Sequence, residues 1–186
     1  MSQPMPGQLK FTSKNTMEMR WRIDWQTPDK YIYAARDVMG DIDLDPISSD
    51  RANARVNAKT YYTEESDGLK HDWTGRIWLN PAYEILPECV QKLIMHYDND
   101  DIEEAILFTH TLTTWEPWFQ DALRSAEVVC FIDELVEWYA GHTPELPLIH
   151  EFGIDPIYDV RGTIAAYYGP HKDAFCDVFR QFGAIK

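Results

Sequence analysis

The feature that most constrains the fold is a regular alternation between short apolar runs and segments with helical periodicity. The apolar runs predict strands near residues 41–46, 60–63, 76–79, 105–108, 128–132 and 162–169. Helices are predicted at 28–39, from 87 onward, at 115–123 and at 174–182, with a helix-permissive stretch at 48–58. Strands joined by helical crossovers form right-handed units that build parallel sheets. The sequence therefore predicts an α/β domain with a mainly parallel sheet.

A polar loop follows the apolar run Ile77-Trp78-Leu79. Pro81 biases Asn80 away from the helical region, so the turn begins where the strand ends. Ligands of open α/β sheets bind beside the carboxyl ends of the strands. An asparagine oxygen can accept a hydrogen bond from an amine, and the ring of Tyr83 can stack on a flat ring. The loop indicates chemistry on an amino group of a planar heterocycle; the alternative is that Asn80-Pro81 only opens a turn.

Two further segments bear on the site. The alternation of acidic and apolar residues from Asp41 to Pro46 predicts a short strand that ends at Asp45, and the alternative is a solvated acidic loop. Thr27 precedes Pro28, a pattern typical of an N-cap hydroxyl followed by proline at the first helical position. A third segment is predicted to lie in the core rather than to form a base-stacking platform; it contains Trp115, Trp118 and Phe119.

The length of 186 residues suits one domain. Residues 1–20 are predicted to be a mobile arm, because the chain begins with prolines, glycine and small polar residues without a period. No apolar run approaches the ~20 residues of a membrane span, and the first ten residues lack a signal-peptide core, so we expect a cytoplasmic protein without membrane association. Cys89, Cys130 and Cys176 are widely spaced and predicted to be buried free thiols.

The net charge of −14, from 31 acidic and 17 basic residues, repels polyanions at long range. A local basic stripe can nevertheless contact phosphates, and the N-terminal segment offers Lys10, Lys14, Arg20 and Arg22. No metal site is predicted, because the candidate ligands lack a tight spacing; they are His71, Asp72, His96 and His110.

The order of several short motifs resembles the phage-type DNA N6-adenine methyltransferases, over nearly the whole chain from Trp25 onward. The motifs are Trp25-x-Thr27-Pro28, Asp43-Leu44-Asp45-Pro46, Asp67-Gly68-Leu69, Trp73, Trp78-Leu79-Asn80-Pro81-Ala82-Tyr83, Trp118-Phe119 and Gly162 to Gly169. The resemblance implies a single Rossmann-like methyltransferase domain, residues 21–186, that binds S-adenosylmethionine at the strand ends. It also implies a DNA partner with an adenine-containing target site, and a phage or prophage source.

The resemblance also implies roles for individual residues. Asn80, Pro81 and Tyr83 would form the catalytic loop that takes the target adenine. The cofactor site would contain Thr27, Asp43, Asp45, Asp67 and Leu69, with Thr27 near the methionine carboxylate and Asp67 and Leu69 near the adenine ring. The family reads Asn or Asp, two prolines and an aromatic residue in this loop, whereas the second proline is Ala82 here.

The mechanism expected from these residues needs no covalent enzyme intermediate. The exocyclic nitrogen of adenine is a poor nucleophile because its lone pair is delocalised into the ring. Acceptors such as the Asn80 side-chain oxygen and the Pro81 carbonyl favour a more tetrahedral, nucleophilic nitrogen that approaches the methyl group in line. A stacked adenine must first be flipped out of the duplex, at a cost of a few kcal/mol.

The alternative function is a catalytically degenerate methyltransferase fold that serves as a binding or decoy protein. Ala82 in the loop and the acidic total favour it, as do Glu134 and Glu137, which stand where relatives tend to carry a basic stretch. Cofactor binding followed by methyl transfer to unmethylated DNA separates the two hypotheses.

Overall fold

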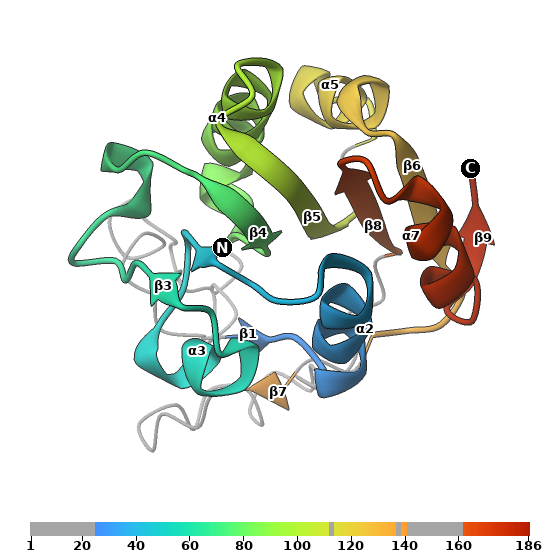
Figure 1. Cartoon of the computed structure of the whole chain (residues 1–186), viewed down its shortest axis with the longest axis horizontal. Helices are drawn as coiled ribbons and strands as arrows, with labels where there is room; N and C mark the ends of the chain where they lie inside the picture. Colours follow the sequence, from blue (N-terminus) through green and yellow to red (C-terminus); the bar gives the residue numbers. More distant parts are fainter. Residues whose placement is uncertain (1–24, 112–113, 137–138, 141–161) are drawn as a thin grey trace, which may run out of the picture.

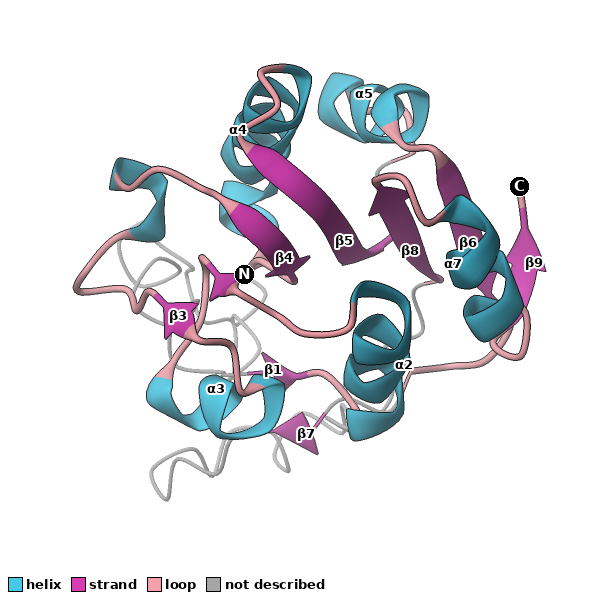
Figure 2. Cartoon of the chain, in the orientation of Figure 1, coloured by secondary structure: helices cyan, strands magenta, loops and turns pink. Residues whose placement is uncertain are grey.

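A computed structural model describes residues 25–111, 114–136, 139–140 and 162–186. Its main feature is a seven-stranded sheet with the spatial order β3-β2-β4-β5-β8-β6-β9 (Figures 1 and 2). The strands are β2 (Leu44–Asp45), β3 (Thr60–Tyr61), β4 (Gly75–Leu79), β5 (Ile102–His110), β6 (Val128–Ile132), β8 (Thr163–Tyr168) and β9 (Gly183–Ile185). A separate antiparallel pair joins β1 (Trp25–Gln26) to β7 (Tyr139–Ala140).

The sheet is mixed, with a parallel half and an antiparallel half. Strands β3, β2, β4 and β5 are parallel neighbours, as predicted. Strand β8 lies between β5 and β6 and is antiparallel to both, and β9 is antiparallel to β6. The prediction of a mainly parallel sheet is therefore corrected at β8 and β9, because an apolar run has the same composition whichever way its strand runs.

Helices cover both faces of the sheet and give three layers (Figure 1). The helices α2 (Asp29–Met39) and α7 (Lys172–Phe179) lie on one face, and α4 (Leu86–Asp98) and α5 (Pro117–Ser125) on the other. Side chains of β4 alternate between these layers: Trp78 joins the core under α2 and α7, whereas Ile77 and Leu79 join the core under α4 and α5. Both faces of the sheet are therefore buried, which explains the continuous apolar runs in the sequence.

The start of α2 differs from the prediction in one respect. The helix begins at Asp29, and Pro28 occupies the N-cap position with an extended ψ of 137° and no side-chain cap bond. Thr27 therefore lies one residue too early to cap the helix. Its hydroxyl is engaged by Asn80 instead, at the end of β4. The predicted end is confirmed, since Gly40 follows Met39 with a φ of 80°.

The chain changes direction across the sheet between β2 and β4. From β2 it passes through α3 (Asp50–Val56) to β3 on one side, and then returns to place β4 on the other side of β2. Such a reversal opens a crevice outside the carboxyl ends of the two strands. Asp45 and Asn80 stand at those two ends.

Some predictions fall outside the described residues. These concern the arm at 1–20, the basic side chains of the N-terminal segment up to Arg22, and Glu137. Within the described part of the chain, no helix is both long and apolar enough to cross a lipid bilayer.

Candidate functional site

The candidate site lies at the carboxyl edge of β2 and β4. The parallel register pairs Leu44 with Ile77, so the ends of the two strands are neighbours. Asp45 is 3% exposed, and its Oδ2 accepts a hydrogen bond of 2.8 Å from the Ser48 hydroxyl. This hydrogen bond closes the turn after β2 onto the side chain of Asp45, the last residue of the strand.

Asn80 is held in a defined orientation at the end of β4. Its Nδ2 donates to the Thr27 hydroxyl over 2.9 Å. Thr27 is only 4% exposed, and Pro81 is buried. No hydrogen bond to the Asn80 Oδ1 is found among the described residues. The amide thus turns its donor toward Thr27, and its acceptor oxygen has no hydrogen-bond partner in the described part of the chain.

The loop after Asn80 continues into the short 3-10 helix η2 (Tyr83–Ile85). The Ala82 carbonyl accepts from the Ile85 N–H over 3.2 Å, so the loop closes into one tight turn before α4. Tyr83 begins η2, but its side chain lies outside the described part of the structure. The predicted stacking role of Tyr83 therefore stays a prediction.

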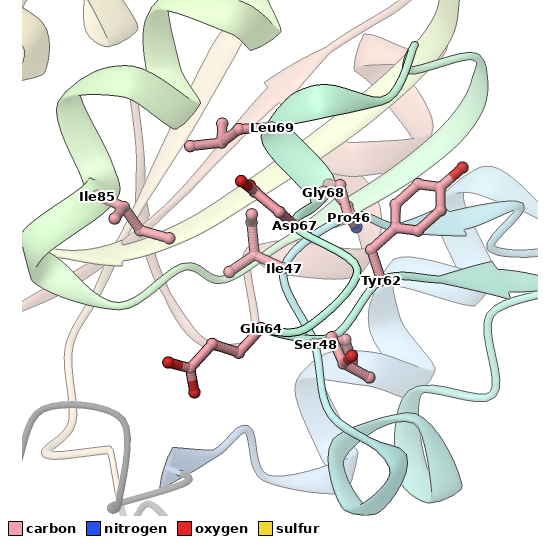
Figure 3. A pocket seen from close by; sticks show the side chains of 10 residues that line it. Pro46, Ile47, Ser48, Tyr62, Glu64, Asp67, Gly68, Leu69 and Ile85 are labelled. Atoms are coloured by element: carbon pink, nitrogen blue, oxygen red, sulfur yellow. The ribbon is translucent and has the colours of Figure 1, made fainter. Parts of the chain in front are cut away.

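A pocket of about 270 Å³ opens beside this edge (Figure 3). Three segments form it: the turn after β2, the loop from β3 to the 3-10 helix η1 (Gly68–Lys70), and η2. Ile47, Leu69 and Ile85 surround the opening from these three segments (Figure 3). The complete lining is Pro46, Ile47, Ser48, Tyr62, Thr63, Glu64, Asp67, Gly68, Leu69 and Ile85. Two predicted cofactor residues, Asp67 and Leu69, are among them.

Gly68 allows two walls of this pocket to touch. A Cβ built on Gly68 would lie 1.7 Å from the Pro46 carbonyl oxygen, far inside any contact distance. The Trp73 indole N–H donates to the Gly68 carbonyl over 2.9 Å and holds η1 against the rest of the fold. The sequence Asp67-Gly68-Leu69 therefore needs its glycine for close approach to the turn after β2.

Asp67 contributes a charge to the lining of the pocket. It adopts the left-handed conformation with a φ of 53°, and its carboxylate lies 3.0 Å from the Lys70 ammonium. The hydrogen bond from Lys70 lowers the pKa of the Asp67 carboxyl below its ordinary value. Asp67 is therefore an anion near neutral pH.

Asp43 is separated from this pocket. It precedes β2, and its carboxylate accepts three hydrogen bonds from Arg76: from the backbone N–H at 3.0 Å, Nε at 2.6 Å and Nη2 at 3.0 Å. Lys59 adds an ion pair at 2.6 Å. The Arg76 guanidinium holds the pKa of Asp43 well below its usual range. The structure thus places Asp43 in a cluster that joins β2 to β4. Like Thr27 and Asp45, it is not among the residues that line the pocket.

The aromatic segment after β5 was only partly predicted. Trp118 and Phe119 are 6% and 1% exposed, which confirms them as core residues of α5. The prediction is wrong for Trp115, which is 74% exposed on the loop that follows the carboxyl end of β5. Helix α5 begins at Pro117, two residues later than expected. Trp115 therefore precedes the helix and is not part of its buried face.

Cys89 and Cys130 show no feature of a nucleophile, and the prediction of a buried thiol is wrong for Cys176. Cys89 and Cys130 are buried, and Cys176 is partly exposed. Burial raises the pKa of the Cys89 thiol to about 12 and that of the Cys130 thiol to about 11. Both thiols are therefore protonated at neutral pH and unsuited to covalent catalysis.

Two of the histidines weighed as metal ligands are bound within the fold. The ring of His71 stacks on Tyr62 with 4.0 Å between centroids, and His96 Nδ1 lies 2.9 Å from an Asp101 carboxylate oxygen. The described residues contain no group of three or more ligands that could hold a metal ion.

Several pocket residues were missed by reasoning from sequence. Ile47, Ser48, Tyr62, Glu64 and Ile85 carry no motif of their own and come from three different segments. These residues lie just after β2, just after β3 and just before α4. Because ligands of α/β sheets bind beside the carboxyl ends of the strands, a search of the residues that follow each strand would have suggested those after β2 and β3.

Comparisons with known proteins show the family of this chain. A family model described as DNA N-6-adenine-methyltransferase (Dam) matches residues 14–145. A curated relative, the DNA N-6-adenine-methyltransferase of Escherichia phage T1, is 26% identical over 111 residues. That alignment covers 59% of this chain and 44% of the relative, so the chain spans less than half of that protein's length. Because the family model covers most of the chain, including both strand ends of the site, the protein belongs to the DNA N-6-adenine-methyltransferase (Dam) family.

Proposed function

We propose that this protein transfers a methyl group from S-adenosylmethionine to the N6 amino group of adenine in DNA. The observation that carries the proposal is Asn80, whose donor is bound to Thr27 and whose acceptor is left at the carboxyl edge of β4. Family membership and the name of the phage T1 relative support the same reaction. The mixed α/β sheet with its reversal between β2 and β4 supports a Rossmann-like methyltransferase fold.

The residues at the pocket fit the proposed cofactor. Ile47, Leu69 and Ile85 provide apolar contacts for the faces of a purine, and Asp67 provides an acceptor at the rim. Asp45 stands at the end of β2, beside the turn that forms one wall. We propose that Asp45, Asp67 and Leu69 hold S-adenosylmethionine, which supplies an electrophilic methyl group on a sulfonium.

The target amine would be held by Asn80 and Pro81. An amide oxygen that accepts an amino proton favours pyramidal nitrogen, and this demand grows as the nitrogen becomes nucleophilic. The Pro81 carbonyl follows directly in the chain and would accept the second amino proton. The Cys89 and Cys130 thiols are protonated and buried. The proposed transfer is a direct displacement positioned by the loop, without a covalent enzyme intermediate.

The second candidate function is that of a catalytically degenerate binding protein. The argument for it from the acidic residue Glu134 is weaker once the structure is considered. Glu134 accepts a hydrogen bond of 2.7 Å from the Tyr31 hydroxyl and pairs with Lys30, so this carboxylate ties α2 to the chain after β6. The charge of Glu134 is thus offset by its own contacts. Ala82, in place of the second proline of the family, remains an argument for the binding protein. A measurement of methyl transfer decides between the two candidate functions.

The test uses calorimetry with S-adenosylmethionine and transfer of a labelled methyl group to unmethylated DNA. Wild type should bind the cofactor and methylate the DNA. Asn80→Ala should lower turnover by about 10²–10³ while cofactor affinity changes little, as expected for one positioned polar contact. Cofactor binding without methyl transfer to any unmethylated DNA would favour the binding protein.

A further inference from the structure

We infer that Trp115 contacts the DNA substrate by stacking on a base that flanks the target adenine. The inference rests on the proposed function, since it takes the target adenine to be held at Asn80. Trp115 is 74% exposed, although the other tryptophans whose side chains the structure describes are at most 6% exposed; they are Trp73, Trp78 and Trp118. Packing of the fold therefore does not account for the indole of Trp115, whereas an exposed aromatic ring can stack on a base.

Trp115 lies on the loop that leaves the sheet next to Asn80. Strands β4 and β5 run side by side in the same direction, and Leu79 is level with Leu107 (Figure 1). Strand β5 continues to His110, so it projects roughly 10 Å beyond the end of β4 at ~3.3 Å per residue. DNA that delivers an adenine to Asn80 must approach this edge of the sheet, where the loop from β5 to α5 begins.

Contacts among the described residues hold this loop on both sides. At its start, the Thr111 N–H donates to the Gly162 carbonyl over 2.7 Å and ties the loop to the residue before β8. Next to the indole, the Thr114 carbonyl accepts from the Gln120 Nε2 of α5 over 2.6 Å. Trp115 thus projects from an anchored backbone, which lowers the entropy lost when its ring is ordered against a base.

The charge of this loop favours a base rather than a phosphate as its partner. Residues 111–116 contain no lysine or arginine, and Glu116 is their only charged residue. A phosphate is repelled by Glu116, whereas the face of a base carries no net charge. When the target adenine leaves the stack, each base beside it exposes a face that an indole can cover. Trp115 therefore matches a flanking base and not the phosphate backbone.

Homopolymer DNA tests the contact without a known recognition sequence, because every adenine in it has the same neighbours. The probes are a short oligodeoxyadenylate and the same oligomer with an abasic nucleotide at every second position, which removes both bases beside each remaining adenine. Binding is measured by fluorescence anisotropy at low salt for wild type, Trp115→Leu and Trp115→Phe. Tyr33→Leu is the matched control, because Tyr33 is 61% exposed on α2, outside the loops at the strand ends.

On the full oligomer, Trp115→Leu should bind about 5- to 100-fold more weakly than wild type, as for the loss of one stacked base. Trp115→Phe keeps an aromatic ring and should lose less, and Tyr33→Leu should bind like wild type. On the abasic oligomer, wild type and Trp115→Leu should differ by less than about 3-fold, because the stacking partner is missing. Equal affinities of wild type and Trp115→Leu for the full oligomer would overturn the inference. So would an equal loss of affinity in Trp115→Leu on both oligomers.

A kinetic measurement separates this inference from the proposed function. With unmethylated DNA, Trp115→Leu should raise the KM for DNA, while the KM for S-adenosylmethionine and Tm stay at their wild-type values. A raised KM for S-adenosylmethionine or a lowered Tm would overturn the inference, because Trp115 would then serve the cofactor site or the fold. Wild type that methylates no DNA but shows the expected binding pattern would refute only the proposed function. Methyl transfer with DNA affinities that do not depend on Trp115 would refute only the inference.

Discussion

Gly68→Ala tests whether the pocket beside β2 is the cofactor site. A Cβ at this position would lie 1.7 Å from the Pro46 carbonyl oxygen and 2.8 Å from its carbonyl carbon. Contacts below 3.0 Å are essentially never made by a real Cβ, so the two backbone segments must move apart by more than 1 Å. The moving parts are two walls of the pocket, the turn after β2 and η1.

The expected cost has two components. Overpacking of this kind destabilises the fold by about 1–3 kcal/mol. For a chain of this length that lowers Tm by roughly 2–4 °C per kcal/mol. A wall displaced by ~1 Å also misplaces the groups that would contact the cofactor, and in catalysis a misplacement of this size can cost about 10²-fold. We therefore expect S-adenosylmethionine affinity to fall by ~10- to 100-fold in calorimetry at a temperature where the variant remains folded.

A matched control is available at the other end of the sheet. A Cβ on Gly183, in β9, would lie 1.9 Å from the Phe131 carbonyl oxygen, a clash of the same kind. Strand β9 is at the opposite edge of the sheet from β3, so Gly183→Ala should lower Tm to a similar extent and leave cofactor affinity unchanged. If Gly68→Ala and Gly183→Ala lose the same stability and both bind S-adenosylmethionine like wild type, the cofactor does not occupy this pocket.

Two further substitutions address the cluster at Asp43 and the exposed Trp115. Asp43→Asn should lower the free energy of unfolding by about 2 kcal/mol, because the carboxylate accepts charged hydrogen bonds from Arg76 and Lys59, and should leave cofactor affinity unchanged. The pKa of Asp43 is depressed in the folded state. The ionised carboxylate therefore stabilises the fold above its unfolded pKa of about 4, and this stabilisation is lost as pH falls toward the folded pKa. In chemical denaturation, the unfolding free energies of the variant and of wild type should converge below about pH 4. Trp115→Ala should leave Tm unchanged and weaken DNA binding by about 1–3 kcal/mol, as for loss of one aromatic stacked on a base, and fluorescence anisotropy showing equal DNA affinity would place the stacking surface elsewhere.

Helices and strands were predictable from the sequence where a pattern of neighbouring residues marks them. The helix after Thr27-Pro28 ends at Met39, before Gly40, as predicted, and the apolar runs at 105–108 and 128–132 lie within β5 and β6. Asp45 and Asn80 were correctly placed at strand ends, because the residues before them are apolar and a proline follows each. Those signals depend on neighbours within a few positions, which is what sequence patterns report.

What sequence alone determined about this protein is most of the helices and strands, the family resemblance, and Asn80 and Asp45 as strand-end residues; the short strands β1, β7 and β9 were not predicted. The tertiary structure decided the directions of β8 and β9, the exposure of Trp115, and the separation of Asp43 from Asp45, two residues apart in the chain. It also decided that the Thr27 hydroxyl meets Asn80 rather than the start of α2. These outcomes depend on which distant segments pack together. Arg76 binds Asp43, and Asn80 at the end of β4 binds Thr27, only once the sheet has assembled.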